Sequence, residues 1–138
     1  MGAVRKLVAV LGLMSLLVIG AAAPAQAASS AERAYAAAVG ECPVGDFCVW
    51  SGSDATGSIC NWANADADWY SAPVVCSWAD NQVVRSAMNR GQSTSYRSVF
   101  FYSGANYTGT YGCLAQNGGF MNDIRETLRS HRWRTNAC

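Results

Sequence analysis

Two short glycine-containing segments, each placed between apolar runs, set the pattern of this chain. Residues 50–57 read Trp-Ser-Gly-Ser-Asp-Ala-Thr-Gly, and residues 102–109 read Tyr-Ser-Gly-Ala-Asn-Tyr-Thr-Gly. An apolar, β-prone run precedes each segment, and a second such run ending near a cysteine follows it. Strand, glycine-rich turn and strand is the pattern of a β-hairpin. Because the pattern occurs twice, the sequence predicts a duplicated β unit.

The rest of the chain predicts further strands. We expect residues 83–89 to close the first unit, and residues 98–102 and 111–115 to form strands of the second. Residues 124–134 lead into a last strand, with Trp133 in the core. We expect each unit to fold as a Greek key. Two Greek keys that face each other form an all-β sandwich with little helix.

The first part of the chain has the features of an export signal. Arg5 and Lys6 precede an uninterrupted apolar run, and Ala25-Gln26-Ala27 provides the small-x-small site at which signal peptidase cuts. The apolar run is shorter than the roughly 20 residues of a membrane-spanning helix. We therefore expect residues 1–27 to be a signal peptide, and the mature protein to be secreted and extracellular.

Residues 28–41 are rich in alanine and lack a sustained apolar face. We expect this segment to be flexible, as a fraying helix, a remnant of the leader or a pro-segment, and to lie outside the core. The domain itself would then span residues 42–138, with units at about residues 42–91 and 92–138.

All six cysteines follow the leader. An even number in a short exported chain indicates a disulfide framework, and the sequence alone leaves many pairings open. Metal ligation does not fit the spacing, since there is no Cys-x-x-Cys and a single histidine. Loop closure within a unit is easier than closure between units. We therefore expect three bridges, Cys42–Cys48, Cys60–Cys76 and Cys113–Cys138.

The hairpin pattern resembles that of the βγ-crystallin Greek key, in which an aromatic, four residues, Tyr or Phe, one residue and Gly recur. The glycine provides a turn that a β-carbon does not tolerate, and the two aromatic rings pack across the bent hairpin. Ala55 stands at the second aromatic position of the first copy, so we expect a weaker corner there. The resemblance implies a βγ-crystallin-like sandwich of two Greek-key units, here stapled by disulfides.

The region from residue 42 to residue 138 also resembles peptidase inhibitor family I36, small secreted actinobacterial proteins of βγ-crystallin-like fold. The resemblance rests on Cys-Pro-Val-Gly-Asp-Phe-Cys at residues 42–48, the Trp-Ser-Gly turn that follows, and Ser-Ala-Met-Asn-Arg-Gly at residues 86–91. It implies an inhibitor whose partner is an extracellular peptidase. Well-known members block thermolysin-like metalloproteases, but we find no matching reactive loop here, so the protease class does not carry over.

The sequence carries no recognisable catalytic set. Nucleophilic hydrolysis needs a base beside Ser or Cys, and the single histidine, His131, stands alone in an expected strand. Asp66, Asp68 and Asp80 are interpreted as solvated loop acids, and no glycine-rich phosphate loop leads into a helix. We expect a protein that is not an enzyme and has no cofactor.

The charge balance gives no electrostatic footprint for nucleic acid. The formal net charge of the whole chain is +1, and it falls by two when Arg5 and Lys6 are removed. The one local excess of arginine, between residues 125 and 134, is explained as well by a solvated strand face as by a binding patch. We expect a monomer that binds neither nucleic acid nor membrane.

Calcium binding belongs to the βγ-crystallin pattern, in which two Asn/Asp residues, two spacers and two hydroxyls follow each hairpin. Residues 81–86 read Asn-Gln-Val-Val-Arg-Ser, and residues 122–127 read Asn-Asp-Ile-Arg-Glu-Thr. Calcium requires several hard oxygen ligands. Arg85 would set a cation against the ion at one hydroxyl position, and Glu126 occupies the other. We therefore expect weak calcium binding or none.

The function that these features predict is a secreted peptidase inhibitor that docks a disulfide-held, extended loop in a protease cleft. A loop held in this way loses little entropy on docking. In residues 71–76, Pro73 favours an extended backbone, Val74 and Val75 could fill an apolar subsite, and Cys76 would tether the end. The alternative for this segment is an ordinary strand that enters the core.

The alternative function is a non-enzymatic, crystallin-like module that binds cell walls or carbohydrates, or acts as a toxin. Exported β domains often bind sugars through tryptophan. Four aromatic residues have no role in the expected hairpins and are the candidates for such a platform, although we expect most of them to pack in the core: Trp62, Trp69, Tyr70 and Trp78.

Overall fold

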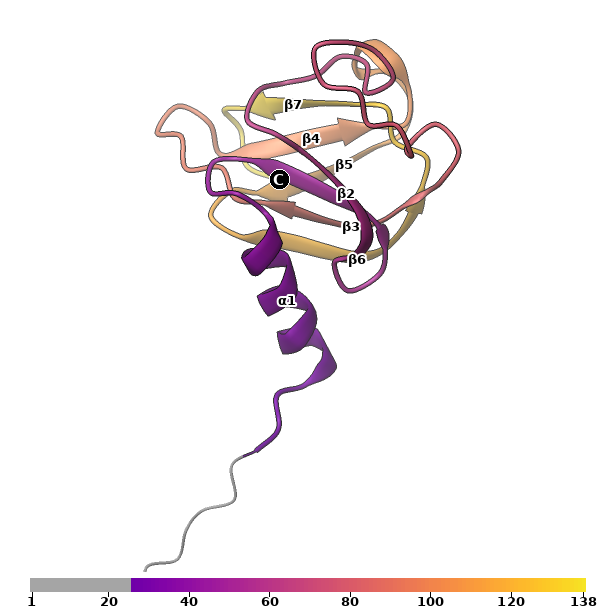
Figure 1. Cartoon of the computed structure of the whole chain (residues 1–138). Coiled ribbons are helices and arrows are strands. Elements are labelled where there is room, and N and C mark those ends of the chain that lie inside the picture. Colours follow the sequence, from indigo (N-terminus) through magenta and orange to yellow (C-terminus); the bar gives the residue numbers. More distant parts are fainter. Residues whose placement is uncertain (1–25) are drawn as a thin grey trace, which may run out of the picture.

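Two antiparallel β-sheets pack face to face in the computed structural model, which describes residues 26–138 (Figure 1). The elements in chain order are α1 (Ser30–Glu41), β1 (Phe47–Gly52), β2 (Thr56–Trp62), β3 (Val84–Asn89), β4 (Ser98–Tyr102), the short 3-10 helix η1 (Ala105–Tyr107), β5 (Tyr111–Ala115), β6 (Gly119–Glu126) and β7 (Ser130–Arg134). The all-β, two-sheet prediction is confirmed. The expected signal peptide lies outside the described residues, apart from its last two positions, and no helix within them is long and apolar enough to cross a membrane.

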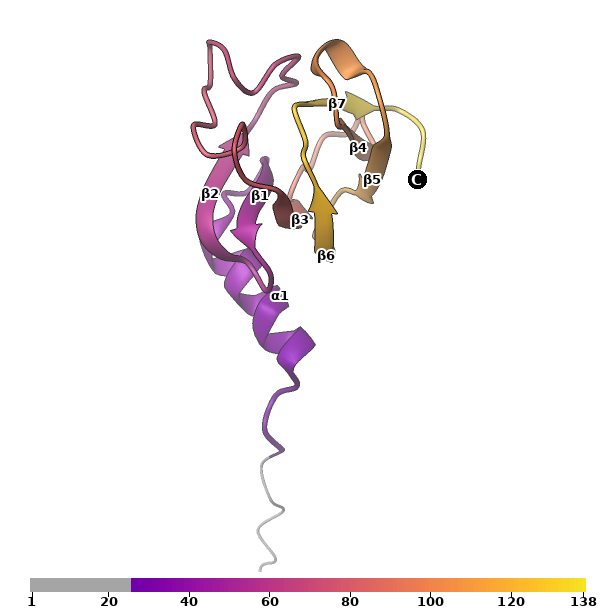
Figure 2. The same ribbon diagram turned by 90° about the vertical axis from the view of Figure 1, so that its right-hand side faces the viewer.

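The two sheets do not coincide with the two sequence units. The first sheet has the order β2-β1-β3-β6 and the second the order β5-β4-β7. Strand β6, from the second unit, pairs antiparallel with β3 of the first, with Ala87 opposite Met121. The reciprocal position beside β7 holds only an isolated bridge between Asp66 and His131. The first sheet is therefore completed by a strand of the second unit (Figure 2), whereas the second sheet gains only this bridge from the first unit.

The turns of the two hairpins have the same backbone conformation. Ala55 and Tyr107 both lie in the left-handed region, with φ of 54° and 63°, and Gly57 and Gly109 have φ of 80° and 82°. A left-handed conformation at a residue with a β-carbon is costly and persists only where its surroundings enforce it. The repeated sequence pattern thus reflects a repeated and locally strained turn.

A buried serine enforces the first of these turns. The Ser86 hydroxyl donates to the carbonyl oxygen of Gly52 at 2.8 Å and accepts the backbone N–H of Ala55 at 3.1 Å. Ser86 is fully buried in β3, which places the next strand of the sheet directly against the corner of the hairpin. Strand and turn therefore stabilise each other.

Ser130 plays the same role in the second unit. Its hydroxyl donates to the carbonyl oxygen of Gly104 at 2.6 Å and accepts the backbone N–H of Tyr107 at 3.0 Å. The hydroxyl pattern of the second unit therefore ends at Ser130. Its assignment to residues 122–127 is wrong, because β6 extends to Glu126 and β7 starts only at Ser130.

Helix α1 is part of the core, so the expectation that residues 28–41 lie outside it is wrong. The helix begins with a capping box, in which Ser29 Oγ accepts the N–H of Glu32 and Glu32 Oε2 accepts the N–H of Ser29. Ala34 and Ala38 are buried. Small side chains let the helix approach the sheet closely without the long apolar side chains that would mark such a face in the sequence.

Polar contacts from β1 and from the residue that follows β3 hold α1 against the first sheet. Trp50 Nε1 donates to Glu41 at 2.8 Å, and the Arg90 guanidinium donates to the carbonyl oxygens of Val39 and Cys42 at 2.8 and 2.6 Å. A cation at the C-terminal carbonyls of a helix also interacts favourably with its dipole. Ala38 joins Trp50 and Ala55 in one buried cluster, so the helix covers the corner where Ala55 lacks a ring.

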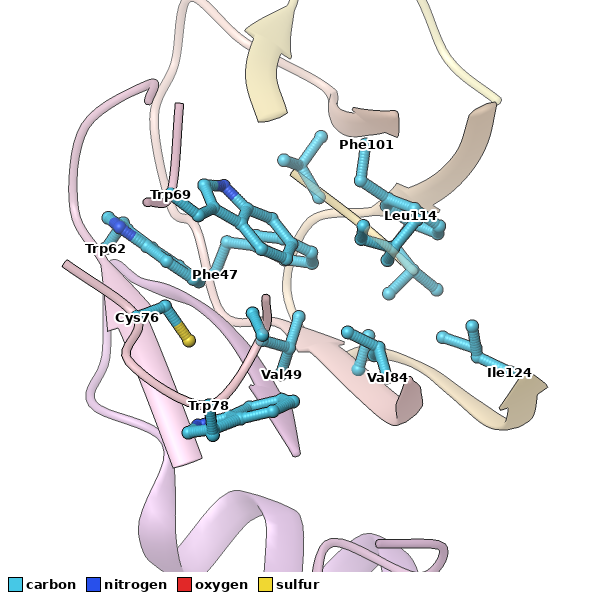
Figure 3. Close-up of a cluster of buried hydrophobic side chains, with 14 residues drawn as sticks. Phe47, Val49, Trp62, Trp69, Cys76, Trp78, Val84, Phe101, Leu114 and Ile124 are labelled. Atoms are coloured by element: carbon cyan, nitrogen blue, oxygen red, sulfur yellow. The ribbon is translucent and has the colours of Figure 1, made fainter. Parts of the chain in front are cut away.

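The main core lies between the sheets and is rich in aromatic rings (Figure 3). Phe47 stacks on Phe101 across the sandwich, with 5.7 Å between ring centroids, and Trp62 stacks on Trp69 at 4.6 Å. Trp133 packs against this cluster but is only partly buried, which corrects its placement in the core.

The three disulfides are Cys42–Cys48, Cys60–Cys76 and Cys113–Cys138, as the preference for closure within a unit predicts. The first lies between α1 and β1, the second joins β2 to the long connection that follows it, and the third attaches the C-terminus to β5. No cysteine is free in the described part of the chain.

Replacing either buried serine should destabilise the fold. Ser86→Ala and Ser130→Ala each leave a buried or partly buried N–H and a partly buried carbonyl of a strained turn without their partner, so we expect the free energy of unfolding to fall by about 1–3 kcal/mol. Urea denaturation measures the effect. Ser77→Ala, at an exposed position, should change it by less than about 0.5 kcal/mol. Equal effects at all three serines would contradict the assigned role.

Candidate functional site

The long connection between β2 and β3, residues 63–83, contains the predicted inhibitory residues. It contains no strand and rises at the end of the sandwich remote from α1 (Figure 1, Figure 2). The connection lies beside β7, at the edge of the second sheet where a fourth strand would pair. Only Asp66 pairs there, through its single bridge to His131. The remaining residues are released from the sheet and form a loop.

Residues 71–75, which we name the tip, are all exposed. Val74 and Val75 expose 40% and 57% of their surface, although both are large apolar residues. Cys76 directly follows them, is buried and is bonded to Cys60 of β2. The alternative interpretation, a strand that carries these residues into the core, is wrong. The structure thus brings Pro73, Val74 and Val75 together on a surface loop tethered at Cys76.

The backbone closes the base of the tip. The N–H of Cys76 donates to the carbonyl of Trp69 at 2.7 Å, and the N–H of Trp69 donates to the carbonyl of Arg129 at 2.9 Å. The hydroxyl of Tyr70 donates to the carbonyl of Ala79 at 3.0 Å. The two arms of the loop are therefore bonded to each other and to the approach to β7.

An ion pair reinforces this base. Arg129 donates through Nε and a terminal nitrogen to both carboxylate oxygens of Asp68, at 2.8 and 2.9 Å, and its guanidinium lies 4.4 Å from the centre of the Tyr70 ring. The hydrogen bonds from Arg129 lower the pKa of Asp68 below its usual value. Asp68 is thus an ion-pair partner rather than the solvated acid that the sequence suggests.

A buried hydrogen bond joins residues 63–83 to the second unit. Trp69 Nε1 donates to His131 Nδ1 at 2.9 Å, and both side chains are fully buried. An indole N–H can only donate, so Nδ1 is unprotonated and Nε2 carries the hydrogen that it donates to the carbonyl of Asn64, at 3.0 Å. Burial lowers the pKa of His131 from its usual value near 6.5 to about 3. His131 is a neutral structural residue.

Sequence reasoning could not find these partners. Asp68 and Arg129 are far apart in the chain, as are Trp69 and His131, and no local pattern links them. Asp66 is also misassigned as a solvated acid: it is buried, pairs with the backbone of His131, and accepts the N–H of Asp68 at 2.9 Å. Asp80 is exposed, as expected.

The tryptophans considered as a sugar platform are not on the surface. Trp62, Trp69 and Trp78 expose 3%, 0% and 8% of their surface and belong to the main core (Figure 3). Tyr70 is half-buried. The expectation that most of these rings pack in the core is confirmed. Trp69 and Trp78 anchor the connection in the core, where Trp69 stacks on Trp62 of β2.

The side chains at the βγ-crystallin calcium positions do not fit the ion. The position of Arg85 is taken in the second unit by Arg129, since Ser130 corresponds to Ser86, so both hydroxyl positions carry a guanidinium. On β6, Asn122 instead exchanges two hydrogen bonds with Asp54, at 2.6 and 2.8 Å. Within residues 26–138 no cluster of three His, Cys, Asp or Glu side chains is placed to hold a metal.

Solved structures show what this fold is similar to. One is a structure described as "Evolution of the eye lens beta-gamma-crystallin domain fold". It has a TM-score of 0.51 at 13% sequence identity, and the match covers 69% of this chain and 91% of that chain. A βγ-crystallin from Ciona intestinalis gives 0.48 at 14% identity, covering 65% and 100%, and spherulin 3A from Physarum polycephalum gives 0.47 at 14%, covering 71% and 90%. The architecture is a βγ-crystallin-like sandwich.

The sequence identifies the family to which the chain belongs. Residues 35–114 match peptidase inhibitor family I36, and the chain belongs to this family. Membership supports a role as a peptidase inhibitor, with a peptidase as the partner. The matched region contains the tip and the first unit and ends in β5. No curated protein matches the chain.

The buried histidine should make stability depend on pH. Native His131 remains neutral down to its pKa of about 3, whereas the unfolded chain binds a proton below about pH 6.5. The stability present above that pH is lost as the pH falls, by about 1.4 kcal/mol per unit from this group. Urea denaturation at about pH 7 and about pH 5 should show this loss of unfolding free energy for the wild type. The loss between the two pH values should be smaller for His131→Gln. An equal loss of unfolding free energy in the wild type and in His131→Gln would contradict a buried, neutral His131.

Proposed function

We propose that the protein inhibits its peptidase by docking the tip, residues 71–75, into the substrate cleft. The observation that carries the proposal is the exposure of Val74 and Val75 directly beside the buried, disulfide-bonded Cys76. Burial of exposed apolar side chains in a partner is favourable by roughly 25 cal/mol per Å². Neither valine belongs to a core cluster of the sandwich.

The base of the tip explains how such docking would be specific and strong. Association costs the ordering of loops and side chains at the interface. The Cys60–Cys76 bridge, the main-chain bond between Trp69 and Cys76, and the ion pair of Asp68 with Arg129 order this loop in advance. Binding energy from the valines is then available as affinity.

The composition of the tip indicates the chemistry of the partner. Ser-Ala-Pro-Val-Val contains no charge, so it suits a cleft with apolar side-chain subsites. Thermolysin-like metalloproteases, the targets of well-known family members, are the class that we propose to test first. In this proposal the inhibitor acts outside the cell as a monomer and supplies no catalytic group.

Charges at the tip should abolish inhibition without unfolding the domain. An apolar subsite takes up an unpaired carboxylate only at a large desolvation cost, so the double variant Val74→Asp/Val75→Asp should raise the inhibition constant by at least about 100-fold. Circular dichroism and melting temperature should be close to wild type, because both positions are exposed. Val44→Asp is the matched control: Val44 is as exposed as Val75, at 57%, and lies before β1. A folded double variant that inhibits normally would remove the tip from the mechanism.

Opening the disulfide tests the ordering of the loop separately from its contacts. In the double variant Cys60→Ser/Cys76→Ser the valines remain, but the end of the tip is released. We expect the inhibition constant to rise by about tenfold or more, since loop ordering must then accompany binding, and the target peptidase to cleave the loop during prolonged incubation. Mass spectrometry of the incubated protein locates the cut. Unchanged inhibition together with an intact loop would show that the bridge has no part in docking.

A further inference from the structure

A concave surface lies where the two units meet. Its nine lining residues come from the turn before β1, the start of the connection, the link between β3 and β4, and strand β7; they are Gly45, Ala63, Asn64, Ala65, Gly91, Gln92, Ser93, Tyr96 and Trp133. We name this surface the cleft. Its volume of about 610 Å³ is within the range of small-ligand sites, roughly 300–1,000 Å³.

One aromatic wall of the cleft is held rigidly. Trp133 Nε1 donates to the carbonyl of Ala63 at 3.2 Å. The ring lies so close to Gly91 that a β-carbon there would come within 2.7 Å of it. Gly91 is itself fixed by Asn89, whose Oδ1 accepts its N–H at 2.9 Å. The indole is therefore ordered in advance, with part of its surface left open to the cleft.

The other aromatic is Tyr96, in the link between the units. Tyr96 is 41% exposed. The N–H groups of Ser95 and Tyr96 donate to Ser93 Oγ at 3.0 and 3.3 Å, which orders the link beneath the ring. Because Ser93 Oγ accepts both bonds, its own hydrogen remains to be donated to a ligand.

The polar groups of the cleft are all neutral. Asn64 and Gln92 supply amides that can both donate and accept, and Ser93 supplies a hydroxyl. No Asp, Glu, Lys or Arg is among the residues that line the cleft. Nothing there compensates the desolvation of a charged ligand, so phosphate and carboxylate groups are poor ligands. A ligand with an apolar face and several neutral hydroxyls matches the set.

We propose that the cleft binds a neutral saccharide, with a sugar ring lying on Trp133 and Tyr96. The C–H groups of a pyranose carry partial positive charge and pack on the negative face of an aromatic ring. The ring hydroxyls then exchange hydrogen bonds with Asn64, Gln92 and Ser93. This site is separate from the tip, so saccharide binding and peptidase inhibition are independent properties of one molecule.

Titration calorimetry of the purified protein with neutral and anionic oligosaccharides tests the proposal. The probes are chitotetraose, cellotetraose, xylotetraose and, as the anionic member, tetragalacturonate. We expect at least one neutral oligomer to bind and tetragalacturonate to bind more weakly. Tyr96→Ala should weaken binding of the neutral oligomer by about tenfold. Trp133→Phe should also weaken binding, while the smaller ring still packs against the edge of the main core.

The matched control is Tyr35→Ala, because Tyr35 on α1 is 42% exposed and lies outside the cleft. It should bind the oligomer as the wild type does, and so should the folded Val74→Asp/Val75→Asp variant. Tyr96→Ala should inhibit the peptidase normally. The proposal is overturned if no neutral oligomer binds at millimolar concentration, if tetragalacturonate binds tightest, or if Tyr96→Ala binds as well as the wild type. Loss of inhibition in Tyr96→Ala without any saccharide binding would overturn it too, by assigning the cleft to the peptidase interface.

Discussion

The hydrogen bond from Trp69 to His131 is the contact on which both proposed surfaces depend. It joins the connection to β7 in a fully buried environment. On one side of it, the backbone of Trp69 carries the base of the tip. On the other, His131 holds the carbonyl of Asn64, at the edge of the cleft. A buried donor and acceptor without partners are costly, so the loop is kept in one place by the same interaction that fixes the histidine tautomer.

Local patterns were sufficient for the features that local chemistry determines. The two hairpins follow from glycine and aromatic spacing, since Gly57 and Gly109 adopt backbone angles that favour glycine. The disulfide pairing follows from short loop closure, because each bridge stays within one unit. The valines of the tip could be proposed as a site, because Pro73 favours an extended backbone beside them and Cys76 would tether the end of the segment.

Contacts between the units were beyond the reach of the sequence. Nothing near Arg129 indicates that its partner is Asp68, and nothing near Trp133 shows that Gly91 will hold its ring at the surface rather than in the core. Helix α1 was placed outside the core for a different reason. Its buried face consists of alanines, whose burial contributes to packing through close approach and leaves no strong hydrophobic periodicity.

The position of β6 has a consequence for how the chain acquires its structure during synthesis. The first unit is made first, but its sheet ends at β3 until β6 arrives from the second unit. An unpaired strand edge of this kind invites pairing with other chains. The N-terminal half on its own would therefore leave the edge of β3 unpaired, despite the internal repeat. The similarity of the two halves in sequence therefore does not make them separate in structure, because one strand of the second half completes the sheet of the first.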